Sequence, residues 1–343
     1  MSNQPGSSTA AEPDQPEATL ADPTADPVDP TVDGSGRAAF APGAVVFAPL
    51  AVVWLAAMLW STRAAIDSAA AGVTALSLSA FALPGVISAA LVAGTAVALA
   101  VTGSLSRRTE RATLRFLAAI GTGLLVGLAV AVAVNLTYAD NATTDTIAST
   151  TAAAAIIGGG LAGARNARVV GAITTAALAA LVFVVAFSRV RDPLSDLFGA
   201  GDTQESVLSA AKWVSRTESL LAGLIAGLVA FGYLTWAHRR AARRDPATPA
   251  LRWPAYLLAG AGPGLLLLLT EVIIRVGGHG LLELAAALSE ADAVAQTSLG
   301  TSRIDNGIWV LFVGALTALI AFGRTLGPAP AEDDPEPATD TAA

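Results

Sequence analysis

Residues 78–101 have the sequence LSAFALPGVISAALVAGTAVALAV and contain no charged side chain. A helix of this length is about 36 Å long, enough to cross the roughly 30 Å hydrocarbon core of a bilayer. Similar runs recur along the 343-residue chain, of which only 14% is charged, against about 25% in an ordinary soluble domain. The sequence therefore predicts an all-α polytopic membrane protein. It excludes a soluble enzyme, a nucleic-acid binder and a disulfide-stapled secreted module.

Eight segments have the length and apolar character of membrane spans. They cover about 42–60, 78–101, 116–136, 147–163, 169–187, 220–237, 253–275 and 308–323. The fourth is the least apolar, because it carries Thr150, Thr151 and four glycines. It is retained because eight spans place thirteen basic residues on the inner side and six on the outer side, whereas seven spans give ten and nine, and cytoplasmic loops are enriched in Lys and Arg. We therefore expect four helical hairpins in the plasma membrane, with both termini in the cytoplasm.

Two acidic tails flank the predicted transmembrane domain, which covers residues 41–325. The first 36 residues hold seven Asp or Glu and no Lys or Arg, and residues 325–343 hold five acids and no base. Segments of this composition bury too little apolar surface to offset the entropy lost on ordering. We therefore predict disorder for residues 1–40 and 326–343.

The two long outer loops contain apolar residues at helical spacing. In 203–216 these residues include Val207, Leu208 and Val214, and a similar pattern covers 281–295. Both stretches are too short and too charged to span, so they are expected to lie along the outer interface as short amphipathic helices. Ser215-Arg216-Thr217-Glu218 and Ser302-Arg303-Ile304-Asp305 are 87 residues apart, which suggests a duplicated hairpin or a chance similarity.

Small residues and prolines mark possible contacts and breaks within the spans. GxxxG spacing occurs at Gly123/Gly127, Gly159/Gly163, Gly223/Gly227 and Gly260/Gly264. Such spacing lets helix backbones approach closely in lipid, and it leaves open whether those faces pack inside one bundle or in a homodimer. Pro84 and Pro263 lie inside predicted spans, where each predicts a kink. A broken helix is the alternative for Pro263, which glycines flank.

Glu271 and Arg275 are the charged residues within a predicted span. Ionisable groups are costly there and often functional. Glu271 lies about 27 Å along the seventh span, near its outer end, and the spacing of four places both side chains on one face. A local ion pair and a ligand-binding pocket are the two interpretations.

Further charges are expected at the outer helix ends. The candidate outer polar site comprises Glu271, Arg275, Arg189, Arg216, Glu218, Arg303 and Asp305. The carboxylates at helix starts complement the helix dipole. The arginines can form an ion-pair ring with them, or bind an anionic headgroup.

No sequence motif indicates a catalytic, metal or cofactor site. The chain has no Cys and only two separated His residues, which is a poor ligand set for a metal, and HExxH, GxSxG and phosphate-loop motifs are missing. Arginine clusters at 107–111 and 239–244 are expected to face anionic lipids of the inner leaflet.

The functional prediction is accordingly a non-catalytic membrane subunit or scaffold, with a protein partner or a second copy of the chain. A transporter or permease for a lipidic or neutral small substrate is the alternative. A water-filled cavity at the membrane midplane near Pro263 would favour transport, whereas a dry, packed bundle would favour the scaffold.

Overall fold

The computed structural model describes residues 41–68, 73–106, 111–137, 142–164, 166–288 and 290–326. Every regular element in these ranges is helical, and they contain no strand. The predicted tails lie outside the described residues apart from Leu326, so their disorder stays a prediction.

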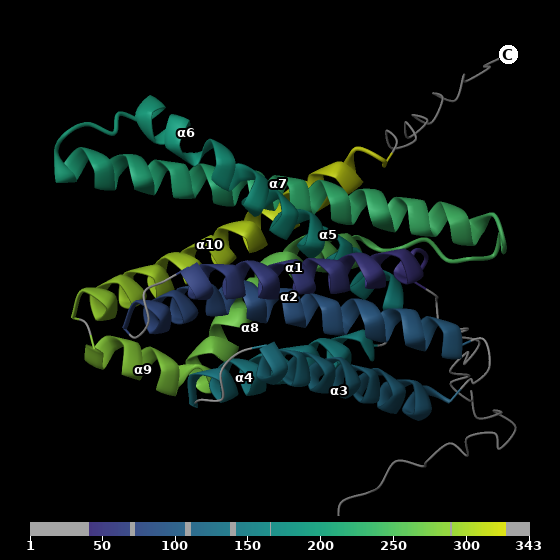
Figure 1. Cartoon of the computed structure of the whole chain (residues 1–343). Helices are drawn as coiled ribbons and strands as arrows, with labels where there is room; N and C mark the ends of the chain where they lie inside the picture. Colours follow the sequence, from purple (N-terminus) through teal and green to yellow (C-terminus); the bar gives the residue numbers. More distant parts are fainter. Residues whose placement is uncertain are drawn as a thin grey trace, which may run out of the picture. The chain divides into compact units, whose positions relative to one another are not determined.

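The described ranges contain ten α-helices and one short 3-10 helix, η1 (Figure 1). Their bounds are α1 Ala44–Ser68, α2 Val73–Leu105, α3 Ala112–Thr137, α4 Ala142–Ala162, α5 Ala167–Phe187, η1 Ser188–Val190, α6 Arg191–Leu197, α7 Gln204–Ala242, α8 Trp253–Gly277, α9 His279–Leu288 and α10 Glu290–Gly323. Local signals fix several of the starts. The Thr203 side chain caps α7 by accepting from the Ser206 backbone N–H, and Pro254 lies in the first turn of α8, where its missing N–H costs nothing.

Seven helical segments of the described chain are long and apolar enough to cross a membrane, which confirms a multi-pass membrane protein. They lie in α1, α2, α3, α5–α6, α7, α8 and α10. The short helix α9 and the longer α4 lie outside this set, and α4 matches the doubtful fourth span. Its 21 residues are about 31 Å long and would reach across the hydrocarbon core. The prediction of eight spans in four hairpins therefore stays a prediction.

The outer-loop helices differ from those predicted. Residues 204–216 are not a separate interfacial helix, because they form the first third of α7, a continuous helix of 39 residues. No Gly or Pro interrupts the chain from Gln204 to Ala222, and Ala210 and Val214 are buried, so nothing breaks the helix there. The 281–295 stretch is divided between α9 and the start of α10.

Close backbone contacts join α2, α3 and α4. Gly123 on α3 lies against Gly159 on α4, and Gly127 lies against Ala152. On the other side of α4, Gly158 faces Leu91 and Thr95 of α2, while Gly94 of α2 faces Ala155. We call these contacts the glycine seam; Figure 1 shows α3 and α4 side by side. Two of the four predicted GxxxG pairs thus pack within one chain.

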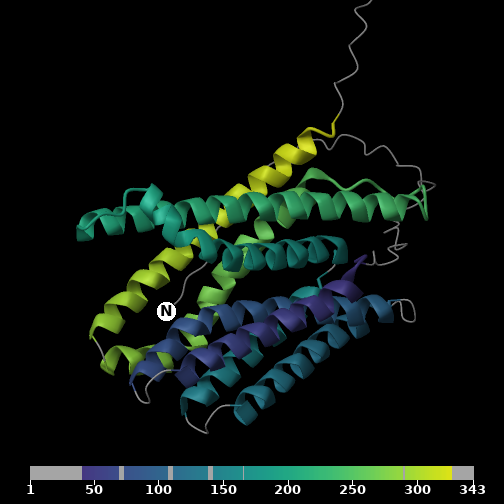
Figure 2. The same cartoon turned by 45° about the horizontal axis from the view of Figure 1, so that its top comes forward.

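The other two GxxxG pairs pack α7 and α8 against α10. Gly223 and Gly227 lie against Val310, Val313 and Gly314, and Gly260 also faces Gly314. Figure 2 shows α10 crossing α7 in this half of the molecule. All four GxxxG pairs are therefore occupied by contacts inside the chain.

Residues 87 apart meet where α7 and α10 cross. The Ser219 hydroxyl donates to Asn306, and Gly227 lies against Gly314. Positions that the sequence offset pairs therefore lie in register across the two helices, which is compatible with a duplicated hairpin.

Pro84 and Pro263 both lie within uninterrupted helices. α2 continues through Pro84 and α8 continues through Pro263, so the broken-helix alternative for Pro263 is wrong. The flanking glycines serve packing instead: Gly262 lies against Ile173 of α5 and Gly264 against Leu311 of α10.

Candidate functional site

A cavity of about 240 Å³ lies among five helices, α2, α5, α7, α8 and α10. Pro84, Gly85, Ser88 and Val92 line it from α2, and Pro263, Leu266 and Thr270 are among the residues that line it from α8. Pro84 and Pro263 therefore face one space. The cavity is slightly smaller than the 300–1,000 Å³ of drug-sized ligand sites.

One end of the cavity is polar. Apart from Ser88 on α2, the polar residues that line the cavity lie at this end: Glu218, Ser219, Thr270, Glu271, Arg303 and Asn306. Pro263 lies eight residues before Glu271, about 12 Å away along α8, and Val310 lies beyond Asn306 on α10. The remaining lining is apolar, including Val92, Ala177 and Ala222. The cavity is thus amphipathic, with charges at one end and an apolar body.

Glu271 is the charged centre of the polar end. Its side chain is 7% exposed, and its two oxygens each accept from an arginine: Oε1 from Arg275 Nε at 3.2 Å and Oε2 from Arg303 Nε at 2.9 Å. Arg303 is 25% exposed and Arg275 is 59% exposed. The Arg303 pair joins α8 to α10, whereas the Arg275 pair stays within α8. The predicted local pair is present, and the structure adds a second arginine to it.

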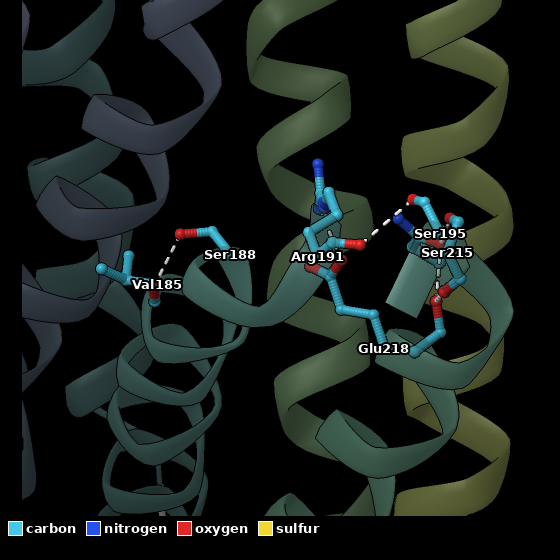
Figure 3. A network of polar contacts seen from close by, with 8 residues as sticks. Val185, Ser188, Arg191, Ser195, Ser215 and Glu218 are labelled. Atoms are coloured by element: carbon cyan, nitrogen blue, oxygen red, sulfur yellow. Dashed lines mark hydrogen bonds and ion pairs between the residues drawn. The ribbon is translucent and has the colours of Figure 1, made fainter. Parts of the chain in front are cut away.

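A second ion pair lies on the same cavity. Arg191, the first residue of α6, donates to Glu218 on α7 over 2.5 Å. Figure 3 shows both residues, with Ser195 and Ser215 nearby. The Ser195 hydroxyl donates to the backbone carbonyl of Arg191 and so closes the first turn of α6. The pair therefore ties α6 to α7.

Asn306 links α7 to α10 beside these pairs. Its Oδ1 accepts from Ser219 Oγ at 2.6 Å and from Ser215 Oγ at 3.3 Å. We use the name polar cluster for Arg191, Glu218, Ser219, Glu271, Arg275, Arg303 and Asn306. In a low-dielectric surrounding such bonds fix helix positions strongly, because an unpaired polar group there is costly.

The structure brings together four of the seven predicted site residues. Glu271, Arg275, Glu218 and Arg303 belong to the polar cluster. Arg189 and Asp305 are exposed and do not line the cavity. Arg216 is also exposed, and its guanidinium lies over the Trp213 ring. A complete ring of ion pairs is therefore not present in the described residues.

Sequence reasoning missed Arg191, Ser219 and Asn306. In the sequence Arg189 and Arg191 lie two residues apart, and the start of α6 at Arg191 decides which of the two faces Glu218. Ser219 and Asn306 carried one available signal, the 87-residue offset that also aligns Ser215 with Ser302.

Some residues that line the cavity are not fully buried. Of its lining residues Gly85 is exposed, and Leu181 and Val184 of α5 are half-buried. A Cβ built on Gly85 would meet only Met58 Sδ, at 4.0 Å. At the polar end, Arg303 and Asn306 are half-buried. The least buried residues of the cavity lining therefore lie on α2 and α5 at the apolar side and on α10 at the polar end.

The described residues contain no group of three or more His, Asp or Glu placed to hold a metal ion. The chain matches no protein-family model, and neither curated proteins nor solved structures give a significant match. The site alone therefore carries the functional argument.

Proposed function

We propose that this protein is a transporter or permease of eight spans that binds a small lipidic molecule in the cavity between α2, α5, α7, α8 and α10. The observation that carries the proposal is the cavity itself, which lies at Pro263 and has an apolar body and one polar end. A membrane scaffold has no need of such a space, because close packing of helices is its main source of stability in lipid.

The size of the cavity limits the substrate. About 240 Å³ holds one short acyl chain or a small amphipathic molecule, and it is too small for a two-chain lipid. The exposed Gly85 and half-buried Leu181 provide an approach from the apolar phase. We therefore propose that the apolar part of the substrate enters between α2 and α5 and that its polar end meets the polar cluster.

Binding is tested by analysing what co-purifies with the protein. Mass spectrometry of extracts from the purified chain should find a single-chain amphipathic molecule in stoichiometric amount. Ala222→Leu should lose it, because three added carbon atoms fill the cavity from α7 while the chain stays folded. Ala129→Leu is the matched control, since Ala129 is exposed on α3 and outside the cavity.

Transport is tested by reconstitution. Proteoliposomes should move the co-purified molecule across the bilayer, and the Ala222→Leu protein should not. If the wild type and Ala222→Leu carried the same bound molecules and the same flux, the proposal would be wrong.

The second candidate remains a non-catalytic subunit or scaffold in the plasma membrane with both termini in the cytoplasm. The glycine seam favours it, since this half of the molecule is closely packed. Under this alternative Ala222→Leu keeps full function in the cell, and a partner protein co-purifies in place of a small molecule.

A further inference from the structure

Arginines outnumber carboxylates in the polar cluster, although the charged residues that line the cavity itself are Glu218, Glu271 and Arg303. Three guanidinium groups, those of Arg191, Arg275 and Arg303, face two carboxylates, those of Glu218 and Glu271. One carboxylate is shared: Glu271 accepts from both Arg275 and Arg303. Within this set one positive charge therefore lacks a counter-charge.

Arg303 is the arginine placed to use that charge. It is the one arginine among the residues that line the cavity, and its side chain is 25% exposed, against 52% for Arg191 and 59% for Arg275. Its bond to Glu271 uses Nε alone. A guanidinium has five N–H donors arranged to bind carboxylate or phosphate oxygens in pairs. The terminal nitrogens of Arg303 thus remain for a ligand.

Two neutral hydroxyls also line the polar end of the cavity, those of Ser219 and Thr270, and both residues are buried. Their hydroxyls already donate, to Asn306 and to the Leu266 carbonyl respectively, and the carboxylates of Glu218 and Glu271 are already paired with arginines. The terminal N–H groups of Arg303 therefore remain as charged donors at the polar end. An anionic head can accept from these N–H groups, whereas a cationic head cannot.

We infer that the substrate carries an anionic head, a carboxylate or a phosphate, on a single apolar chain, and that Arg303 binds this head while the chain occupies the cavity. The inference rests on the proposed function and narrows it, because a neutral substrate was equally open from the sequence. In the absence of the anion, the Glu271 carboxylate pairs with the Arg303 guanidinium through Nε. The anion and Glu271 therefore compete for the positive charge of one guanidinium, although they bind different nitrogens.

A chain without cysteine allows a direct test. Ser88 is buried and lines the cavity from α2, so Ser88→Cys supplies one thiol inside it. In nanodiscs of zwitterionic phosphatidylcholine, decanoate and decyl phosphate should protect this thiol from a small methanethiosulfonate reagent. Decanol should protect it at least about tenfold less well, as expected for loss of one charged hydrogen-bonded contact. Comparison of the two anions identifies the preferred head, and inorganic phosphate alone should not protect.

Two arginine variants and one glutamate variant complete the test in the Ser88→Cys background. Arg303→Gln should weaken protection by both anions on the order of tenfold and leave decanol unchanged. Arg216→Gln removes the same charge outside the cavity and should have no effect. Glu271→Gln should strengthen protection by the anions, because it removes the competing carboxylate; a merely structural role of Glu271 would not produce this gain.

The outcomes separate the two proposals. If decanol protects as well as decanoate and Arg303→Gln changes neither, the anionic head is wrong and the proposed function stands. If inorganic phosphate alone protects fully, the apolar chain plays no part and the inference is also wrong. If none of the amphipathic probes protects Ser88→Cys, the proposed function itself fails.

Discussion

The glycine seam and the polar cluster join helices by different means. In the seam, α2, α3 and α4 touch through backbone atoms at Gly94, Gly123, Gly158 and Gly159. At the polar cluster, α7, α8 and α10 are joined by side chains, through Glu271–Arg303 and Ser219–Asn306, and glycines pack the same helices closely at other positions, such as Gly260 against Gly314. The cavity lies beside the side-chain links. We call the polar cluster with its cavity the binding half and the seam the rigid half.

The largest effect is expected from a side chain added to the seam. Gly158→Val should lower stability by about 3 kcal/mol, at the upper end of overpacking costs, because a Cβ there would lie 3.0 Å from the Thr95 backbone nitrogen and closer still to Leu91. Gly160→Val is the control two residues on, where a Cβ meets nothing within 4 Å. The melting temperature in detergent measures both. Equal melting temperatures would mean that the seam is not closely packed.

The next effect concerns the choice of partner by Glu271. Glu271→Gln should destabilise the protein by about 2 kcal/mol, because Arg303 then lacks its counter-charge. Adding Arg303→Met should recover more stability than adding Arg275→Met, since Arg275 is 59% exposed and Arg303 25% and exposed pairs are screened. A double-mutant cycle for each pair measures the coupling. A larger coupling to Arg275 would show that the helix-to-helix bond is not the main one.

A smaller effect is expected at the link between α7 and α10. Asn306→Ala should cost about 1 kcal/mol, because it removes the hydrogen bond from the Ser219 hydroxyl to α10 and leaves that hydroxyl the Ser215 carbonyl of its own helix. Thr301→Ala on the same helix removes an exposed hydroxyl that bonds only to Thr297 and should change stability by less than about 0.5 kcal/mol. Thermal unfolding of the two variants, measured side by side, tests this difference. Indistinguishable losses of stability would mean that Asn306 does not hold α7 and α10 together.

The smallest effect on stability is expected where the cavity accepts a larger side chain. Ala222→Leu should change stability by less than about 1 kcal/mol, since it grows into existing space, whereas Ala155→Leu should cost about 3 kcal/mol. Both alanines are buried, but Ala155 contacts Gly94 and Gly123 of neighbouring helices. Unfolding in detergent again provides the comparison. If Ala222→Leu were as damaging as Ala155→Leu, the binding half would be as tightly packed as the seam.

The sequence was sufficient for the membrane class and for most helix positions. Uncharged runs and their lengths predicted the apolar helices, and the GxxxG spacing marked the contacts that α3, α4, α7 and α8 make. The sequence could not show where the loop helices end, because helical spacing in 203–216 is the same whether that stretch stands alone or continues into α7. Only burial of Ala210 and Val214 by the tertiary structure explains the long helix.

The sequence predicted several residues of the candidate site but not how they are arranged in space. Glu271 and Arg275 were detectable because charge within a span is costly, and the spacing of four predicted their pairing. The Arg303 pair spans 32 residues and the Arg191 pair spans 27, so their formation depends on how α8 meets α10 and how α6 folds. Pro84 and Pro263 gave no sign that they face one cavity, since they lie 179 positions apart in the chain.

Accessibility of single thiols tests the division between the two halves most directly. Ala222→Cys lies on the cavity and Ala155→Cys in the seam, both at buried positions of a chain that has no other cysteine. A small neutral thiol reagent should modify Ala222→Cys much faster than Ala155→Cys in the folded protein, and both should react fully after unfolding. Equal, slow modification of the two folded variants would contradict the presence of the cavity, because the binding half would then hold no accessible space.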